Sequence, residues 1–268
     1  MNNDILIPLL LTTFAGLSTG IGSLIAFFST KTNKRFLSFS LGLSAGVMIY
    51  VSFVELFNES QRLLISEFEG KEGEIISVLC FFGGIFLIGA IDKLVPSFQN
   101  PHEIRSVENM EKAPNSNNTK LMRVGLMTAL AVGIHNFPEG IATFIAAIEN
   151  PNVGLVIAVA VAIHNIPEGI AVSVPIYHAT GDRKKAFCFS FLSGLAEPIG
   201  ALLTYLFLAP FISLKLMGYT LAIVAGIMVF ISLDELLPAA REYGEHHIAI
   251  YGLIVGMGIM AVSLLLLN

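Results

Sequence analysis

The side chains best suited to binding a metal ion belong to a hexapeptide that occurs twice in this chain. His-Asn-Phe-Pro-Glu-Gly at residues 135–140 returns as His-Asn-Ile-Pro-Glu-Gly at residues 164–169. Both copies lie inside long apolar runs, in which their glutamates are the only charged residues. A carboxylate within an apolar membrane helix is costly, and such residues usually mark a functional site.

Each copy places three metal-binding groups on one face of a helix, because the carboxylate follows the imidazole by four residues and the amide by three. The six side chains are His135, Asn136, Glu139, His164, Asn165 and Glu168. Imidazole, carboxylate and amide oxygen are ligands for zinc and for other first-row divalent metals. A single His–Glu pair could simply link two helices, but the recurrence of all six positions favours a metal site.

Each copy also contains a proline, and a proline inside a helix removes one backbone hydrogen bond. Pro138 has no N–H for the carbonyl of Ile134, and Pro167 has none for that of Ile163. We therefore expect a kink or break in both helices, with freed backbone oxygens facing a polar cavity. The pair Glu197-Pro198 makes the sixth apolar segment a third candidate for a break.

The composition excludes a soluble domain. Hydrophobic residues make up 54% of the 268 residues, charged residues only 13%, and the mean hydropathy is +0.77. Soluble domains contain about 25% charged residues. Apolar segments long enough to cross a bilayer recur from end to end, which predicts one multi-pass helical membrane domain over residues 1–268 with the lipid bilayer as its partner. The net charge of −5 and the lack of a basic stripe exclude a nucleic-acid partner.

The apolar segments predict eight transmembrane helices. They cover about residues 5–28, 36–57, 75–95, 121–148, 153–178, 186–208, 216–237 and 248–267. An acidic loop is expected at 59–74, and a flexible polar linker at about 97–120.

Two pairs of these segments resemble each other in sequence. Residues 44–56 align with 224–236 at an offset of 180, and residues 16–22 align with 194–200 at an offset of 178. An odd number of crossings separates the members of each pair, so they run in opposite directions. The predicted fold is all-α, polytopic and arranged 3+2+3, with helices 1–3 and 6–8 forming an inverted-topology repeat around helices 4–5. Such repeats are common in secondary transporters and place the substrate site near the midplane.

At the doubled hexapeptide the sequence resembles the ZIP (Zrt/Irt-like) family of divalent-metal transporters, and most of all its bacterial zinc-uptake branch. The resemblance implies uptake of zinc, and of ions such as Fe²⁺, Mn²⁺, Co²⁺ and Cd²⁺, by alternating access. It implies no cofactor apart from the transported ion. The implied metal ligands are the six motif side chains and an acid of the sixth helix: His135, Asn136, Glu139, His164, Asn165, Glu168 and Glu197. Many members have a histidine-rich loop between helices 3 and 4, whereas this loop holds only His102.

The distribution of lysine and arginine predicts the orientation in the membrane. The loops that follow the odd-numbered helices, with the adjoining helix ends, hold 12 of the 15 basic residues. By the positive-inside rule these loops are cytoplasmic and both termini lie outside the cell membrane, the inner membrane of a bacterium. Glu55 is then a candidate for the entrance, and Asp234 and Glu235 for the exit. A homodimer is left open.

The competing hypothesis is an intramembrane metal-dependent hydrolase. A zinc protease would carry His-Glu-x-x-His, with the glutamate as general base. Neither copy has that spacing, and no further catalytic group stands out, so we expect a transporter with no catalytic residues.

Overall fold

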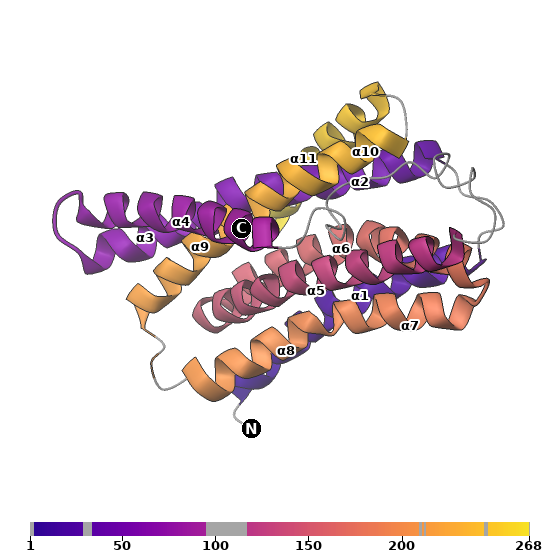
Figure 1. Cartoon of the computed structure of the whole chain (residues 1–268). Helices are drawn as coiled ribbons and strands as arrows, with labels where there is room; N and C mark the ends of the chain where they lie inside the picture. The colour runs from indigo at the N-terminus through magenta and orange to yellow at the C-terminus, as the bar shows by residue number, and fades with distance from the viewer. Residues whose placement is uncertain are drawn as a thin grey trace.

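The computed structural model of the chain describes residues 3–28, 34–94, 117–208, 211, 213–243 and 246–267, and these are almost wholly helical (Figure 1). The helices are α1 (Asn3–Phe28), α2 (Lys34–Val51), η1 (Ser52–Leu56), α3 (Phe57–Glu67), α4 (Glu72–Leu94), α5 (Asn117–Glu149), α6 (Pro151–Thr180), α7 (Arg183–Gly194), α8 (Ala196–Leu203), η3 (Thr204–Leu208), α9 (Leu214–Ile231), η5 (Ser232–Leu236), α10 (Leu237–Tyr243) and α11 (His246–Leu267). Within the described ranges they form eight helical stretches, as predicted. The predicted linker lies outside the described residues except for its last four, which begin α5.

The second helix is longer than the sequence predicts. α2, the π-helical turn η1 and α3 form one helix that continues to Glu67, so the expected acidic loop at 59–74 is wrong. The charged residues led to a wrong prediction because α3 is amphipathic. Ser60, Leu63 and Leu64 are buried on one face, while its charged side chains cover the other.

The seventh helix is also extended, from the predicted end near 237 to Tyr243 through η5 and α10. α10 is fixed to the second helix, because the hydroxyl of Ser38 donates a hydrogen bond to the carbonyl oxygen of Ala240 at 2.5 Å. Both residues are fully buried.

The motif prolines do not interrupt their helices. α5 runs through Pro138, and α6 runs through Pro167, each as one helix, so the prediction that these two helices are broken is wrong. The sixth helix, the third candidate for a break, is interrupted at Leu195, between α7 and α8. Pro198 accounts for this break, because it cannot donate to the carbonyl of Gly194 one turn earlier.

The helices pack in two groups (Figure 1). One contains α1, α5, α6, α7 and α8, the other contains α2, α3, α4, α9, α10 and α11, and they meet mainly where α2 packs on α6 and α5 on α9. α6 is central, because 72% of its most apolar 18-residue segment is buried, against 22% for that of α4 and 28% for that of α11. The outer faces of α4 and α11 carry large apolar side chains such as Phe86, Leu79 and Leu265, as expected for contact with lipid.

Seven helices among the described residues are long and apolar enough to cross a membrane: Ile5–Leu24, Ser38–Glu67, Glu72–Ile91, Pro151–Ser173, Arg183–Phe207, Leu214–Arg241 and His247–Leu265. The chain is therefore a multi-pass helical membrane protein. α5, which carries the first motif copy, is not among the seven.

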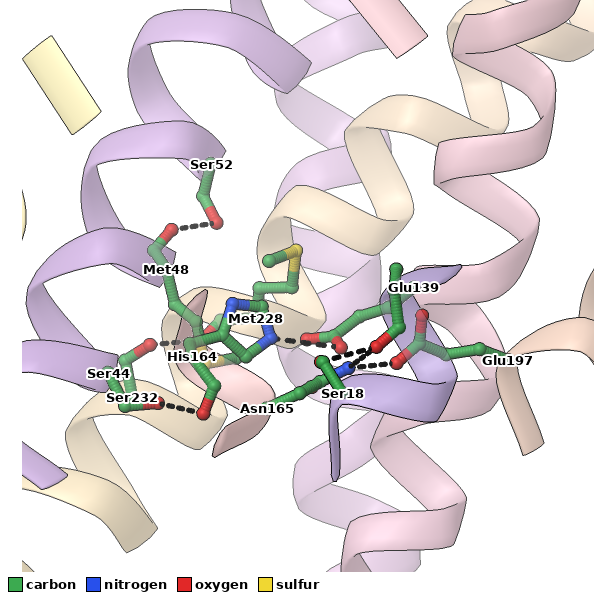
Figure 2. A network of polar contacts seen from close by, with 11 residues as sticks. Ser18, Ser44, Met48, Ser52, Glu139, His164, Asn165, Glu197, Met228 and Ser232 are labelled. Atoms are coloured by element: carbon green, nitrogen blue, oxygen red, sulfur yellow. Dashed lines mark hydrogen bonds and ion pairs between the residues drawn. The ribbon is translucent and has the colours of Figure 1, made fainter. Parts of the chain in front are cut away.

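The second and seventh helices share an unusual local structure. Each contains a π-helical turn, η1 or η5, and these turns begin at Ser52 and Ser232, two positions that correspond in the sequence alignment of the two helices. In each, the serine hydroxyl donates to the carbonyl oxygen of a methionine one helical turn earlier, Met48 or Met228, at 2.7 Å (Figure 2). π-turns within α-helices are rare and are often found at functional sites.

Candidate metal-ion site

A tight turn between α5 and α6 brings the two motif copies together. Asn150 is the only residue between Glu149, the last of α5, and Pro151, the first of α6. Its side-chain oxygen accepts a hydrogen bond from the backbone N–H of Asn152 at 3.0 Å. Proline suits the first position of a helix, where no N–H is needed. The short connection makes the helices antiparallel, and each motif lies about three to five turns from it.

The two copies touch through an imidazole and a carboxylate. Nε2 of His164 in the second copy lies 3.2 Å from Oε2 of Glu139 in the first, and both side chains are buried (Figure 2). α2 reaches the same place, because the hydroxyl of buried Ser44 donates to the backbone oxygen of His164 at 3.4 Å. The two motif copies therefore lie side by side, with the second helix against one of them.

Asn165 joins the second copy to two further helices. Its Nδ2 donates to the backbone oxygen of Ala15 in α1 at 2.9 Å and also to Oε1 of Glu197 in α8 (Figure 2). Glu197 is fully buried in the first turn of α8, directly after the break at Leu195. The break thus places an acidic side chain from a third helix beside the motif residues.

Several polar atoms of this cluster have no hydrogen-bond partner among the described residues. They include both amide atoms of Asn136, Oε1 of Glu139, Oδ1 of Asn165 and Oε2 of Glu197. All four side chains are at most 1% exposed. Buried polar atoms are nearly always paired, and each one left unpaired costs about 1–3 kcal/mol. Buried oxygens with spare lone pairs are suited to a bound cation.

The charges of the cluster also favour a bound cation. Glu168 is 1% exposed, and the carboxylates of Glu139 and Glu168 lie close enough to Glu197 to act on it electrostatically. Three carboxylates buried together repel one another unless protons or a cation compensate them.

The side chain of His135 lies outside the described residues, although its backbone belongs to α5. Among the side chains that are described, no three of the His, Cys, Asp or Glu type are gathered closely enough to form a ready metal cage. An ion at this place would therefore need the amide oxygens of Asn136 and Asn165 as well as the carboxylates.

The sequence did not predict that the first helix contributes to the site. The backbone oxygen of Ala15 receives Asn165, and the hydroxyl of Thr19, one turn further on, is fully buried without a partner in the described part of the chain. Thr143, one turn after Glu139 in α5, has a buried hydroxyl of the same kind. The alignment of Thr19 with Glu197 was the one signal that pointed to the first helix.

The acids proposed for the entrance and exit belong to the two π-helical turns. Glu55 belongs to η1, and Asp234 and Glu235 belong to η5. Glu55 and Glu235 are half-buried and Asp234 is exposed.

Comparison with known proteins gives one consistent result. The family model of the ZIP zinc transporters matches residues 93–264. The zinc transporter ZupT of Streptococcus mutans is 61% identical to this chain over 266 residues, which cover 99% of each protein. ZupT of Oceanobacillus iheyensis is 60% identical over 99% of each, and ZupT of Clostridium perfringens is 58% identical over 98% of this chain and 97% of its own length. With one copy of the hexapeptide on each of two adjacent helices and relatives matched almost from end to end, the chain belongs to the ZIP zinc transporter family.

Proposed function

We propose that this chain transports Zn²⁺ across a membrane through the cluster at α5, α6 and α8. The observation that carries the proposal is the set of buried, unpaired oxygens on Asn136, Glu139, Asn165 and Glu197. Proteins almost identical in length and about 60% identical in sequence are named zinc transporters, which supports Zn²⁺ as the cargo. Because the family consists of transporters, the hydrolase alternative is set aside.

We further propose that the ion is held by His135, Asn136, Glu139, His164, Asn165, Glu168 and Glu197. In this proposal Glu139 and Glu168 bridge two ions, one held by the histidines and the other by the asparagines and Glu197. Nitrogen and oxygen ligands together suit zinc and also admit harder ions such as Fe²⁺ and Mn²⁺. Co²⁺ and Cd²⁺ are expected as further cargo on the same grounds.

The proposed membrane arrangement has eight spans, α5 included, and an inverted repeat. Close backbone contacts that recur at corresponding positions of the two halves support the repeat. A Cβ on Gly22 of α1 would clash with the backbone oxygen of Ile166, and a Cβ on Gly200 of α8 would clash with that of Phe137. The two glycines correspond in the alignment of the first and sixth helices, and the two contacted residues occupy the same place in the two motif copies. α1 therefore packs on α6 as α8 packs on α5.

A second pair of contacts extends the correspondence to the outer helices. A Cβ on Gly84 of α4 would clash with the backbone oxygen of Ile223, and a Cβ on Gly256 of α11 would clash with that of Leu43. Leu43 and Ile223 correspond when the alignment of the second and seventh helices is extended by one position, so α4 corresponds to α11. No sequence similarity had indicated this third pair.

Transport is proposed to proceed by alternating access, with uptake into the cytoplasm and both termini outside the inner membrane. The asymmetry of basic residues supports this orientation. Glu55 and Glu235 occupy corresponding places in η1 and η5 on helices of opposite direction. They are therefore suited to receive the ion at the outer mouth and to release it at the inner one, with Asp234 beside the exit.

Uptake by the purified chain in sealed liposomes tests this function. Zn²⁺ should enter the vesicles faster than in protein-free vesicles, and Fe²⁺, Mn²⁺, Co²⁺ and Cd²⁺ should each compete. Vesicles that hold folded protein but admit Zn²⁺ no faster than empty ones would refute transport. Uptake without competition by any other ion would refute the proposed breadth.

A further inference from the structure

Around the metal-ion site, one position breaks the correspondence between the two halves of the chain. The contacts of Glu197 with the motifs have counterparts at Thr19. A Cβ on Gly140 would clash with the backbone oxygen of Glu197, and a Cβ on Gly169 would clash with that of Thr19. Gly140 and Gly169 follow the glutamates of the two motif copies. Thr19 thus lies beside the second copy as Glu197 lies beside the first.

The crossing of α1 and the α7–α8 break is built around the same two positions. A Cβ on Gly16 would meet the backbone oxygen of Gly194 and lie 3.2 Å from the Cβ of Glu197. A Cβ on Gly194 would meet the backbone oxygen of Gly16 and lie 2.9 Å from the Cβ of Thr19. Glu197 therefore packs over Gly16, which lies one helical turn before Thr19. Thr19 in turn packs over Gly194, which lies one turn before Glu197.

Only one of the two sides has a hydrogen bond between its two polar side chains. Glu197 is bonded by Nδ2 of Asn165 from the second motif copy. The corresponding partners are Thr19 and Asn136 of the first copy. Both are fully buried, yet the hydroxyl of Thr19 and both amide atoms of Asn136 have no partner in the described residues. A threonine is too short to repeat the bond that the longer glutamate makes.

We propose that Thr19 lines the cation site from the side opposite Glu197, and that with Asn136 it helps to hold the ion's coordination shell as a neutral oxygen donor. The inference rests on the transport function proposed above and adds to it a residue from the first helix. A hydroxyl at this place keeps the site at three carboxylates where a symmetric site would have four. Position 19 therefore sets the charge of the site and its preference among divalent cations.

Removing the hydroxyl tests this role. Thr19→Val keeps the shape of the side chain, and Thr19→Ser keeps the hydroxyl. The matched control is Thr12→Val, because Thr12 is equally buried in α1 but donates to the backbone oxygen of Pro8 at 2.9 Å. Zn²⁺ and Mn²⁺ are titrated separately into the purified full-length protein, and their uptake into liposomes is compared. Thr19→Val should change the ratio of the two affinities about fivefold, the size of one lost hydrogen-bond-like contact. Thr19→Ser and Thr12→Val should keep the wild-type ratio.

Moving the charge gives a second, independent test. Glu197→Gln should weaken binding of both ions, and Thr19→Asp in the same chain should restore at least half of the lost affinity, because the carboxylate returns from the opposite side. If the Thr19→Val protein keeps the wild-type ratio of Zn²⁺ to Mn²⁺ affinity, the inference is wrong, whatever the double variant does. A folded double variant that stays as weak as Glu197→Gln also overturns it. If wild-type protein takes up no divalent ion, the transport function fails instead.

Discussion

Nε2 of His164 lies 3.2 Å from Oε2 of Glu139, and this contact joins the two copies of the repeated hexapeptide. Both side chains are buried between α5 and α6, at the centre of the molecule. The contact shows that the two copies meet in one place, with one copy on each helix. It also fixes which imidazole nitrogen faces the carboxylate.

His164→Ala should reduce Zn²⁺ uptake without abolishing it, because the carboxylate and amide oxygens remain to hold the ion. His164→Gln should lie between the alanine variant and the wild type, since its side chain can still reach a carboxylate. Initial uptake rates at equal protein content give this order. Complete loss of uptake in the folded alanine variant would show that the imidazole is indispensable, contrary to the proposed oxygen-rich site.

Asn165→Asp should make the metal-free protein less stable and shift its preference toward Mn²⁺. An ionised aspartate cannot donate to Ala15 or to Glu197, and it adds a negative charge beside Glu197. Added carboxylates favour harder ions. Melting temperatures with and without Mn²⁺, and competition during uptake, measure both effects. Asn152→Asp, at the exposed start of α6, is the control. An unchanged competition profile would remove Asn165 from the ion's ligands.

Gly84→Ala should destabilise the packing of α4 on α9, whereas Gly83→Ala should have little effect. A Cβ on Gly84 would clash with the backbone oxygen of Ile223, while a Cβ on Gly83 has nothing within 4 Å. Overpacking of this kind costs about 1–3 kcal/mol. The two glycines are neighbours on the same helix, so a comparison of the melting temperatures of their variants isolates the close approach. Equal melting temperatures would mean that α4 can move away from α9 at no cost.

A reporter that is active only outside the cytoplasm should be active when it is fused after the last residue of α11. The basic loops predict this side for both termini. The same reporter placed in the 97–120 segment should be inactive. The reverse pattern would invert the proposed orientation, and with it the assignment of Glu55 to the entrance.

The helix positions and the pairing of the motifs could be predicted because they depend on local patterns. Long apolar runs mark the helices, and the repeated hexapeptide marks the candidate site. Helix ends were predicted less well where charged residues continue an amphipathic helix, as Glu59 and Arg62 do in α3. The prolines were misjudged because Pro138 removes only one hydrogen bond, and the packed neighbours of α5 keep the helix whole.

Contacts between distant backbones could not be predicted. The carbonyl of Ala15 that receives Asn165 carries no side-chain signal, since any residue offers a backbone oxygen there. The proposed pairing of α4 with α11 had no sequence similarity to support it, and it rests on the contacts of Gly84 and Gly256 with the carbonyls beside them. Such contacts become visible only when the chain is folded.

The most direct test of the central claim compares Zn²⁺ uptake with folding in Glu139→Ala and Glu168→Ala. Each change removes a carboxylate that any ion at the site would use, and an uncompensated carboxylate within the membrane costs about 2.5–3.5 kcal/mol on insertion scales. Both proteins should reach the membrane, melt at or above the wild-type temperature and take up no Zn²⁺. Glu149→Ala, at the exposed end of α5, should transport normally. Glutamate variants that still transport, or that fail to assemble, would contradict a cation site built on these carboxylates.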